Sequence, residues 1–154
     1  MDSTRLIACI AEPIAIQLAT RTEDLTPRSV RGFGVRFDAE SNALSVGVLD
    51  AQAIEFLAAL RASHAIAVNL THPVSIRGVQ VKGPLLSIEE PSADAAEAAT
   101  SYFARFTEVV AILGFEPEVF RGMFHSGAAR WLKMRPVQMF DQTPGPGAGR
   151  RLTR

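Results

Sequence analysis

The feature that most limits the possible folds is an alternating apolar run, residues 74–90, whose phase changes at two glycines. The apolar side chains fall at even, then odd, then even positions: Val74 and Ile76, Val79 and Val81, Leu86 and Ile88. The changes occur near Gly78 and near Gly83-Pro84. A strand whose inward and outward faces exchange at glycines is typical of a barrel strand that bends through bulges. We therefore predict one long bent strand, since the alternative of two short strands lacks a two-residue hairpin signal.

Five further segments have the pattern of strands. Most of them alternate apolar residues with a period of two: residues 14–18, 28–38, 44–48, 66–70 and 129–141. Their hairpin-like spacing favours antiparallel pairing, and with the bent strand they make six. The order of segments predicts a mainly β (α+β) fold, in which an antiparallel six-stranded β-barrel has flanking helices.

Helices are expected beside these strands. Asp50 is a good N-cap for a helix through Ala62. Its predicted buried stripe is Ala53, Ile54, Leu57 and Leu60. Residues 1–12 and 116–124 carry weaker helical signals.

A longer helix is predicted to begin at Ser92 or Asp94, where Asp94 and Glu97 have the spacing of a capping box, and to end at Gly114. Apolar residues at steps of four and three predict one buried face: Ala99, Phe103, Phe106, Val110 and Leu113.

Length, charge and cysteine content limit the class of protein. A chain of 154 residues, 47% of them apolar, fits one domain, which we place at residues 1–142, before a flexible tail at 143–154. Equal numbers of acidic and basic residues, 16 of each, exclude a general attraction to nucleic acid or anionic lipid. Cys9 is the sole cysteine, which excludes an intrachain disulfide and a thiol-rich metal site. No apolar run approaches the roughly 20 residues that span a bilayer, so we expect a cytoplasmic protein without a membrane partner.

The predicted strand 28–38 places two glycines and a cation on one face. Gly32, Gly34 and Arg36 lie at alternate positions, opposite Phe33, Val35 and Phe37. Two neighbouring glycines leave backbone bare, so that a flat group or another chain can approach closely.

Two motifs give the chain a resemblance to a known family. The run RGFGVR at 31–36 is similar to a basic-x-apolar-x-apolar-basic strand, and RGVQVKG at 77–83 to an R-x-V-x-V-x-G strand. In this order and spacing they resemble the pyridoxamine 5'-phosphate oxidase superfamily, whose fold is an FMN-binding split barrel. The resemblance implies a homodimer with flavin in the clefts between subunits. It further implies that Arg31 and Arg36 reach the FMN phosphate and that Arg77 and Gly78 lie along the flavin ring, for which Gly32 and Gly34 leave room.

The chain departs from the family's phosphate-binding positions. Where the family has a threonine and then a Ser-x-Lys or Ser-Arg-Lys run, this sequence has Gly47 and then Ala51, Gln52 and Ala53. Gln52 is the one polar side chain left there, and Asp50 adds negative charge at the start of the same helix. Loss of two or three charge-assisted hydrogen bonds, at roughly 1.5–3 kcal/mol each, predicts weakened FMN binding.

Three hypotheses for function follow. The first is a flavin-dependent oxidoreductase that uses FMN on an unidentified small molecule. The second is a non-catalytic split-barrel dimer that has lost flavin and has a binding or structural role, with Arg31 and Arg36 paired to Asp38 or Glu40. The third is a haem-binding relative that uses His64, His72 or His125, although their spacing matches no metal motif.

Some side chains keep two interpretations. Arg77 and Lys82 are either surface residues of a barrel strand or ligand contacts. Trp131 belongs either to the core or a dimer interface, or stacks beside a flavin. His125-Ser126 lacks the strand-to-helix nucleophile elbow, which makes hydrolysis improbable.

Overall fold

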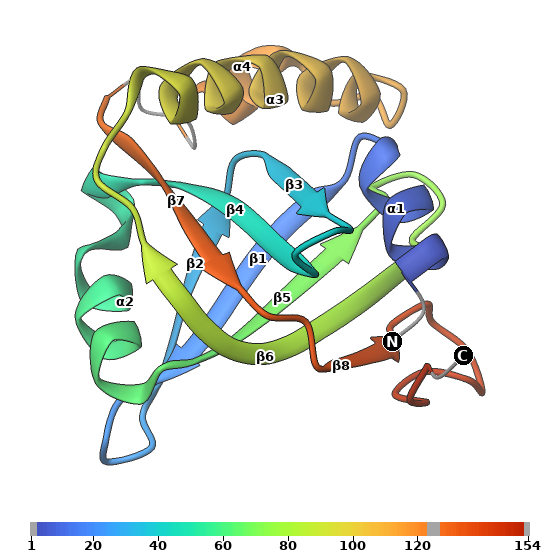
Figure 1. Ribbon diagram of the computed structural model, residues 1–154. Helices are drawn as coiled ribbons and strands as arrows, with labels where there is room; N and C mark the ends of the chain where they lie inside the picture. The colour runs from blue at the N-terminus through green and yellow to red at the C-terminus, as the bar shows by residue number, and fades with distance from the viewer. Residues whose placement is uncertain (1–2, 123–126, 153–154) are drawn as a thin grey trace.

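The bent strand predicted from the glycine-interrupted run is the centre of the structure. In a computed structural model of the chain it is β6 (Gly78–Ile88), the long curved strand that crosses the lower part of Figure 1. Its first half pairs with β5 (Ala65–Thr71) as far as Pro84, and its second half pairs with β7 (Ala129–Met134) from Leu85 onward. The structure describes residues 3–122 and 127–152.

Glycine allows the strand to bend at this point. A Cβ at Gly83 would overlap the carbonyl oxygen of Arg135, which crosses directly over the bend. The register between β6 and β7 then shifts between Leu85 and Ser87. β6 therefore changes partner at Gly83-Pro84, but the predicted change of face does not occur there: Leu85 still packs against the core and Leu86 is 42% exposed, and the register shifts only beyond Leu85.

Within the described residues the chain forms one antiparallel sheet of eight strands, in the order β2-β1-β5-β6-β7-β4-β3. The eighth strand, β8, pairs with the first half of β6 on the edge opposite β5. The remaining strands are β1 (Ala15–Arg21), β2 (Pro27–Gly32), β3 (Val35–Asp38), β4 (Ala43–Leu49) and β8 (Gln138–Asp141). No ladder joins β2 to β3 in this part of the chain, so the sheet is not closed into a ring. This confirms the antiparallel α+β split barrel and corrects the number of strands from six to eight.

The two extra strands come from two predicted strands that each break in the middle. The segment 28–38 divides at Phe33-Gly34, where Gly34 has φ +103° and the chain leaves β1 for β4. The segment 129–141 divides where Pro136 follows Arg135, because proline has no amide to donate to a ladder. Each break moves the chain from one half of the barrel to the other.

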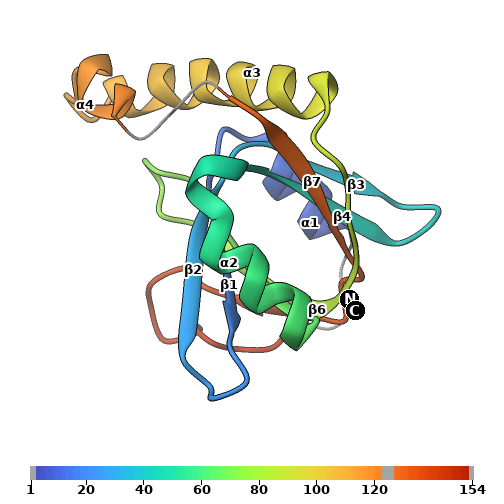
Figure 2. The ribbon, with the colours of Figure 1, turned by 90° about the vertical axis from the view of Figure 1, so that its left-hand side faces the viewer.

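Four helices lie outside the sheet in the described residues: α1 (Ser3–Ala11), α2 (Asp50–Ser63), α3 (Ala93–Ala111) and α4 (Pro117–Arg121). The long α3 lies across one end of the barrel, whereas α1 and α2 flank opposite sides (Figure 1, Figure 2). None of these helices is long and apolar enough to cross a membrane.

The core has two parts. The larger fills the barrel, where the predicted inward residues of β1 and β5 are all buried: Ile14, Ile16, Leu18, Ile66, Val68 and Leu70. The smaller lies between the sheet and α3 and contains Phe33, Leu49, Ala95, Ala99, Ala129 and Trp131. Because α3 is fixed by this second cluster, its position sets the shape of the surface beside β3 and β7.

Several local predictions need correction. Val74 and Ile76 belong to the β5–β6 turn and are exposed, so β6 begins only at Gly78. In α2 the side chain of Ile54 is exposed and Phe56 is buried instead. In α3 Ser92 is the N-cap and accepts a hydrogen bond from the amide of Ala95, and Leu113 lies beyond the end of the helix.

The segment after β8, for which composition predicts a flexible end, makes backbone hydrogen bonds. Leu152 donates to Met139 at 2.7 Å, and Gly149 donates to Asp141 at 2.7 Å. Residues 143–152 thus fold back on β8; their flexibility stays a prediction.

Candidate functional site

The structure places the seven predicted cofactor residues in five places. Gly34 and Arg36 line a small cleft beneath α3, and Arg77 with Gly78 lines a larger cleft beside α1. Gln52 lies in the first turn of α2, outside the lining of either cleft, and Gly32 points into the barrel core. The last of the seven, Arg31, lies with its guanidinium over the ring of Phe106, 5.6 Å from its centroid.

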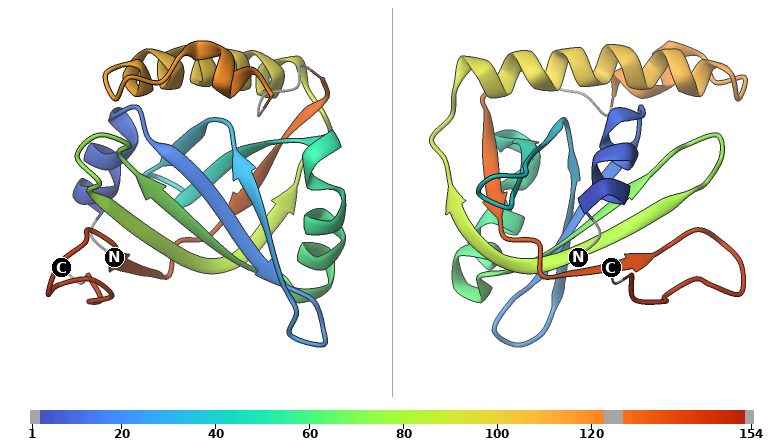
Figure 3. Two further views of the ribbon diagram at one scale, coloured as in Figure 1. Left: turned by 180° about the vertical axis from the view of Figure 1, so that it is seen from behind. Right: turned by 45° about the vertical axis from the view of Figure 1, so that its right-hand side comes forward.

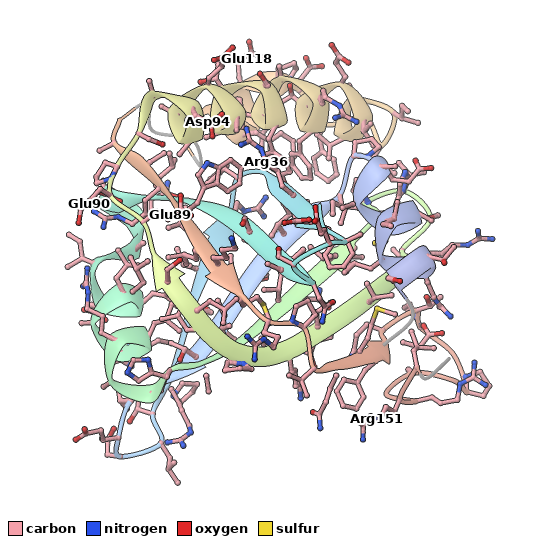
Figure 4. All side chains as sticks on the ribbon, in the orientation of Figure 1. Arg36, Glu89, Glu90, Asp94, Glu118 and Arg151 are labelled. Carbon is pink, nitrogen blue, oxygen red and sulfur yellow. The ribbon has the colours of Figure 1, made fainter. Side chains whose placement is uncertain are left out.

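The small cleft holds about 150 Å³ and is bordered by β3, α3, Trp131 of β7, and the end of α1 with the segment that joins it to β1. Its cation, Arg36, is occupied by an internal partner: two guanidinium nitrogens donate to the two oxygens of Asp94 at 2.7 and 2.9 Å. Figure 4 shows Arg36 directly below α3, at whose start Asp94 lies. Asp94, and neither Asp38 nor Glu40, is thus the partner of Arg36, which corrects the pairing expected from sequence.

Trp131 completes this arrangement from below. The guanidinium of Arg36 lies 4.3 Å from the ring centroid of Trp131, and the indole N–H donates to Asp94 at 2.8 Å. The hydrogen bond from Arg36, and to a lesser extent that from Trp131, holds the pKa of Asp94 below its usual range. The cation is therefore paired at its edge and stacked on its face.

Backbone fills the place where the family has a threonine. A Cβ at Gly47 would come within 2.5 Å of the carbonyl oxygen of Phe33, because residues 33–34 bond to Gly47 on both sides. Gly32 is also not bare, since a Cβ there would meet Ile16 at 2.5 Å in the core. The expectation that both glycines leave one open surface is therefore wrong for Gly32, whose face is covered by core side chains.

The start of α2 carries a second internal pair. Asp50 is the first helical residue rather than the N-cap, and it accepts hydrogen bonds from Arg130 of β7 at 2.6 and 2.7 Å. The side chains are 25% and 13% exposed, and the bonds from Arg130 lower the pKa of Asp50. A carboxylate held at this helix N-terminus takes the position in which a phosphate would gain from the helix dipole.

The larger cleft has a different lining. It holds about 660 Å³ between α1, the β5–β6 turn and the segment after β8, which Figure 3 (right) shows together at one side of the barrel. Apolar side chains from α1, the segment before β1, and β6 form much of its wall: Ala8, Cys9, Ile14 and Val79. Its volume lies within the roughly 300–1,000 Å³ of small-molecule sites.

Most charged groups of this cleft have partners. Arg5 pairs with Asp141 at 2.9 Å, and Asp141 also accepts a hydrogen bond from the amide of Thr143. Burial raises the pKa of the Cys9 thiol, which keeps it protonated near neutral pH.

His72 is held at one nitrogen and faces an acid at the other. Its Nδ1 accepts hydrogen bonds from the amides of Val74 and Ser75, and its Nε2 lies 3.9 Å from Glu12. Arg77 follows at the start of β6, exposed, and its guanidinium has no hydrogen bond or ion pair among the described residues.

The two clefts differ in how well they fit a flavin. At the predicted clamp the edge of Arg36 is bonded to Asp94, Gly47 has no room for a hydroxyl side chain, and Asp50 occupies the helix start. These residues do not fit a phosphate as they stand. The larger cleft offers an apolar wall, volume and a cation, Arg77, that has no side-chain partner in the part of the chain the structure describes, and these suit a flat anionic molecule.

In sequence, no protein-family model and no curated protein matches this chain. Solved structures do match. An F420 reductase superposes with a TM-score of 0.57 at 16% identity, over 86% of this chain and 93% of that one. A pyridoxamine 5'-phosphate oxidase-related, FMN-binding protein from Nostoc punctiforme gives 0.54 at 14% identity, over 94% and 85%. HutZ, the haem storage protein of Vibrio cholerae, gives 0.52 at 12% identity, over 90% and 92%.

The fold is a split barrel, shared with the F420 reductase and the FMN-binding protein above. The resemblance carried by the two sequence motifs is thus confirmed for the fold. At these identities the likeness extends no further, so the ligand of this split barrel has to be argued from its own residues.

Sequence reasoning missed the residues that pair with Arg36 in the small cleft and with Asp50 at the start of α2. Asp94 was predicted as a helix cap, and Arg130 was not singled out. Both lie far along the chain from their partners, Arg36 and Asp50. No local pattern signals such pairs, although charged residues at strand and helix starts are candidates for them.

Metal binding finds no support in the described part of the chain. No group of three or more histidine, cysteine or carboxylate side chains there is arranged to hold a metal ion. His64 is the exposed C-cap of α2, with φ +52°. The third histidine, His125, and its neighbour Ser126 lie outside the described residues.

Proposed function

We propose that this chain is a split-barrel protein that binds a flat, anionic cofactor of the flavin class in the cleft between α1 and the start of β6. The observation that carries the proposal is that cleft: about 660 Å³, with apolar walls and Arg77 at its rim. Two residues that the family resemblance places along the flavin ring, Arg77 and Gly78, are part of its lining.

The walls of the cleft suit a ring system. Ile14 and Val79 come from neighbouring parts of the barrel, and Ala8 and Cys9 are small side chains on the facing helix. Small apolar residues opposite a sheet leave a slot for a planar group, and burial of its faces supplies the main favourable free energy.

We propose further that the chain is an oxidoreductase when flavin is bound. A bound flavin supplies the electron-transfer chemistry, and the protein supplies position and electrostatics. At the cleft wall, Gly78 lets β6 pass close to Thr71 of β5, because a Cβ at Gly78 would lie only 2.8 Å from the Thr71 hydroxyl. The homodimer and the cytoplasmic location implied at the start stay predictions, the first testable by light scattering.

The test is a titration of the purified protein with FMN and with haemin, followed by visible absorption and flavin fluorescence. FMN is expected to bind at tens of micromolar or below. Alkylation of Cys9 gives an independent readout, because this thiol lines the cleft and should be protected when it is filled. Absence of both FMN binding and Cys9 protection would contradict the proposal, and a Soret band after addition of haemin would assign the cleft to haem.

A second function is favoured by a separate observation. Both candidate phosphate contacts of the fold, Arg36 and the start of α2, are closed by carboxylates of the chain itself. This supports a split barrel that has lost flavin and binds another small molecule. It predicts no flavin binding at any concentration below millimolar, with the larger cleft still accessible to Cys9 reagents.

A further inference from the structure

The arginines at the two clefts fall into paired and unpaired groups. Arg36 and Arg130 each donate two hydrogen bonds to a carboxylate, at 2.6 to 2.9 Å. Arg5 forms an ion pair with Asp141. The side chain of Arg77, alone among these four, has no hydrogen bond or ion pair within residues 3–122 and 127–152.

The negative groups near Arg77 are already engaged. Asp141 accepts hydrogen bonds from Thr143 and Arg5, which lower its pKa and keep it ionised. Glu12 faces Nε2 of His72 rather than the guanidinium. Among the described residues, the guanidinium of Arg77 is therefore left without a carboxylate partner and is available to a group that enters the cleft.

We propose that Arg77 is the anion contact of this chain: it binds a phosphate or carboxylate group of the cleft's ligand, in place of the closed clamp at Arg36. The inference rests on the proposed function in one respect only, the flat ring to which the anion is attached. A guanidinium matches the two oxygens of either oxyanion in a bidentate contact.

The surroundings of Arg77 support this role. The hydroxyl-bearing Ser75 and Thr143 line the same cleft. Thr143 accepts a hydrogen bond from the amide of Gly78, and the carbonyl of Arg77 accepts one from the amide of His72. The backbone at Arg77 and Gly78 is thus hydrogen-bonded to neighbouring segments, so the guanidinium extends from an ordered position.

The experiment compares ligands that differ only in the anion. FMN and riboflavin share one ring, and only FMN carries a phosphate; benzoate is a flat carboxylate, and inorganic phosphate has no ring. Each is titrated into the wild-type chain and into Arg77→Ala, with Arg21→Ala as the control. Arg21 is an exposed arginine at the far end of β1 from this cleft.

The expected result is that FMN binds the wild type at least about tenfold more tightly than riboflavin, and that Arg77→Ala removes this difference. Arg21→Ala should leave it unchanged. If the anion is instead a carboxylate, benzoate shows the dependence on Arg77 and FMN equals riboflavin.

Failure of the two proposals can be told apart. If no flavin binds, the flavin proposal is wrong, and the anion site is then judged by thermal stabilisation with phosphate or benzoate. Stabilisation that is present in the wild type and in Arg21→Ala and lost in Arg77→Ala supports the site. Equal affinity for every probe in Arg77→Ala and wild type, or equal loss in both variants, overturns it.

Discussion

The two clefts beside α1 differ in what has happened to their arginines. Beneath α3, Arg36 is held by Asp94 at its edge and by Trp131 at its face, in a space of about 150 Å³. Beside β6, Arg77 has no side-chain partner among the described residues and lies at the rim of a space of about 660 Å³. One cleft thus has its cation held by an internal carboxylate, and in the other we propose that the cation serves for binding.

The comparison teaches that a motif does not fix the use of its residues. RGFGVR ends in Arg36, whose pairing acid Asp94 comes from a helix 58 positions later in the chain, whereas RGVQVKG begins with Arg77, just before β6. Whether an arginine is available depends on this distant partner and not on the motif itself.

The largest loss of stability is expected from removal of the indole ring of Trp131, on which Arg36 stacks. Trp131→Ala should lower the free energy of unfolding by about 3–5 kcal/mol, because Trp131 is 4% exposed and packs under α3. Urea unfolding followed by circular dichroism measures it. Trp131→Phe, which keeps a ring and loses the N–H donor, should cost much less; equal losses would show that packing beneath α3 contributes little.

The next largest loss of stability is expected when the Asp50–Arg130 pair at the start of α2 is broken. Asp50→Ala should destabilise the fold by about 2 kcal/mol, since it leaves Arg130 partly buried without its carboxylate. Glu55→Ala is the matched control on the same helix, because Glu55 is 82% exposed and its change should stay within about 0.5 kcal/mol. If both variants unfold at the same urea concentration, the closed pair is not a structural contact.

Acid should weaken the two carboxylate–arginine pairs, Asp50 with Arg130 and Asp94 with Arg36. The pKa values of Asp50 and Asp94 are both lowered in the folded chain, so unfolding takes up protons once the pH falls toward the ordinary carboxyl pKa. Stability from these pairs is therefore complete above about pH 5 and is lost as the pH drops through their folded values.

The control for this pH dependence is the double variant Asp50→Asn, Asp94→Asn. Its stability should fall less steeply with acid, with the remaining slope due to Asp24, Asp38 and Asp141, whose pKa values are also lowered. Unfolding midpoints between pH 3 and pH 7 provide the comparison. An unchanged slope in the double variant would remove these pairs as the cause.

The smallest effect is a gain of binding. Asp94→Ala frees the guanidinium of Arg36 on the ring of Trp131, the sole tryptophan, and should create a weak phosphate site with a dissociation constant on the order of millimolar. Tryptophan emission on addition of phosphate reports it directly. Asp38→Ala, which removes an exposed acid of β3, should show no such change. A phosphate-dependent change of emission in the wild type would mean that Asp94 does not block the guanidinium of Arg36.

Much of the fold was predictable because it depends on local alternation. Ile16, Leu18 and Val68 are buried as their period of two predicts, and β6 bends at Gly83, where the alternating pattern is interrupted. The breaks at Gly34 and Pro136 were missed since a strand that changes partner keeps its alternation.

The site was predictable only in part. The motifs identified Arg36 and Arg77 as strand arginines, but the difference between them is made by Asp94 and by the volume of each cleft. Ile54 was misplaced for a related reason: the face that α2 buries is chosen by the sheet it packs on, and several faces of this alanine-rich helix are apolar enough.

The position of β7 has a consequence for how the barrel is made. Residues 129–134 form a strand between β4 and β6, which precede it in the chain by about 80 and 45 positions. A growing chain that has not yet reached residue 129 therefore has two bare strand edges, and pairing across so many residues is slow. Synthesis must pass residue 134 before the two halves of the barrel can join, and until then the exposed strand edges are prone to aggregation unless charged side chains or a chaperone protect them.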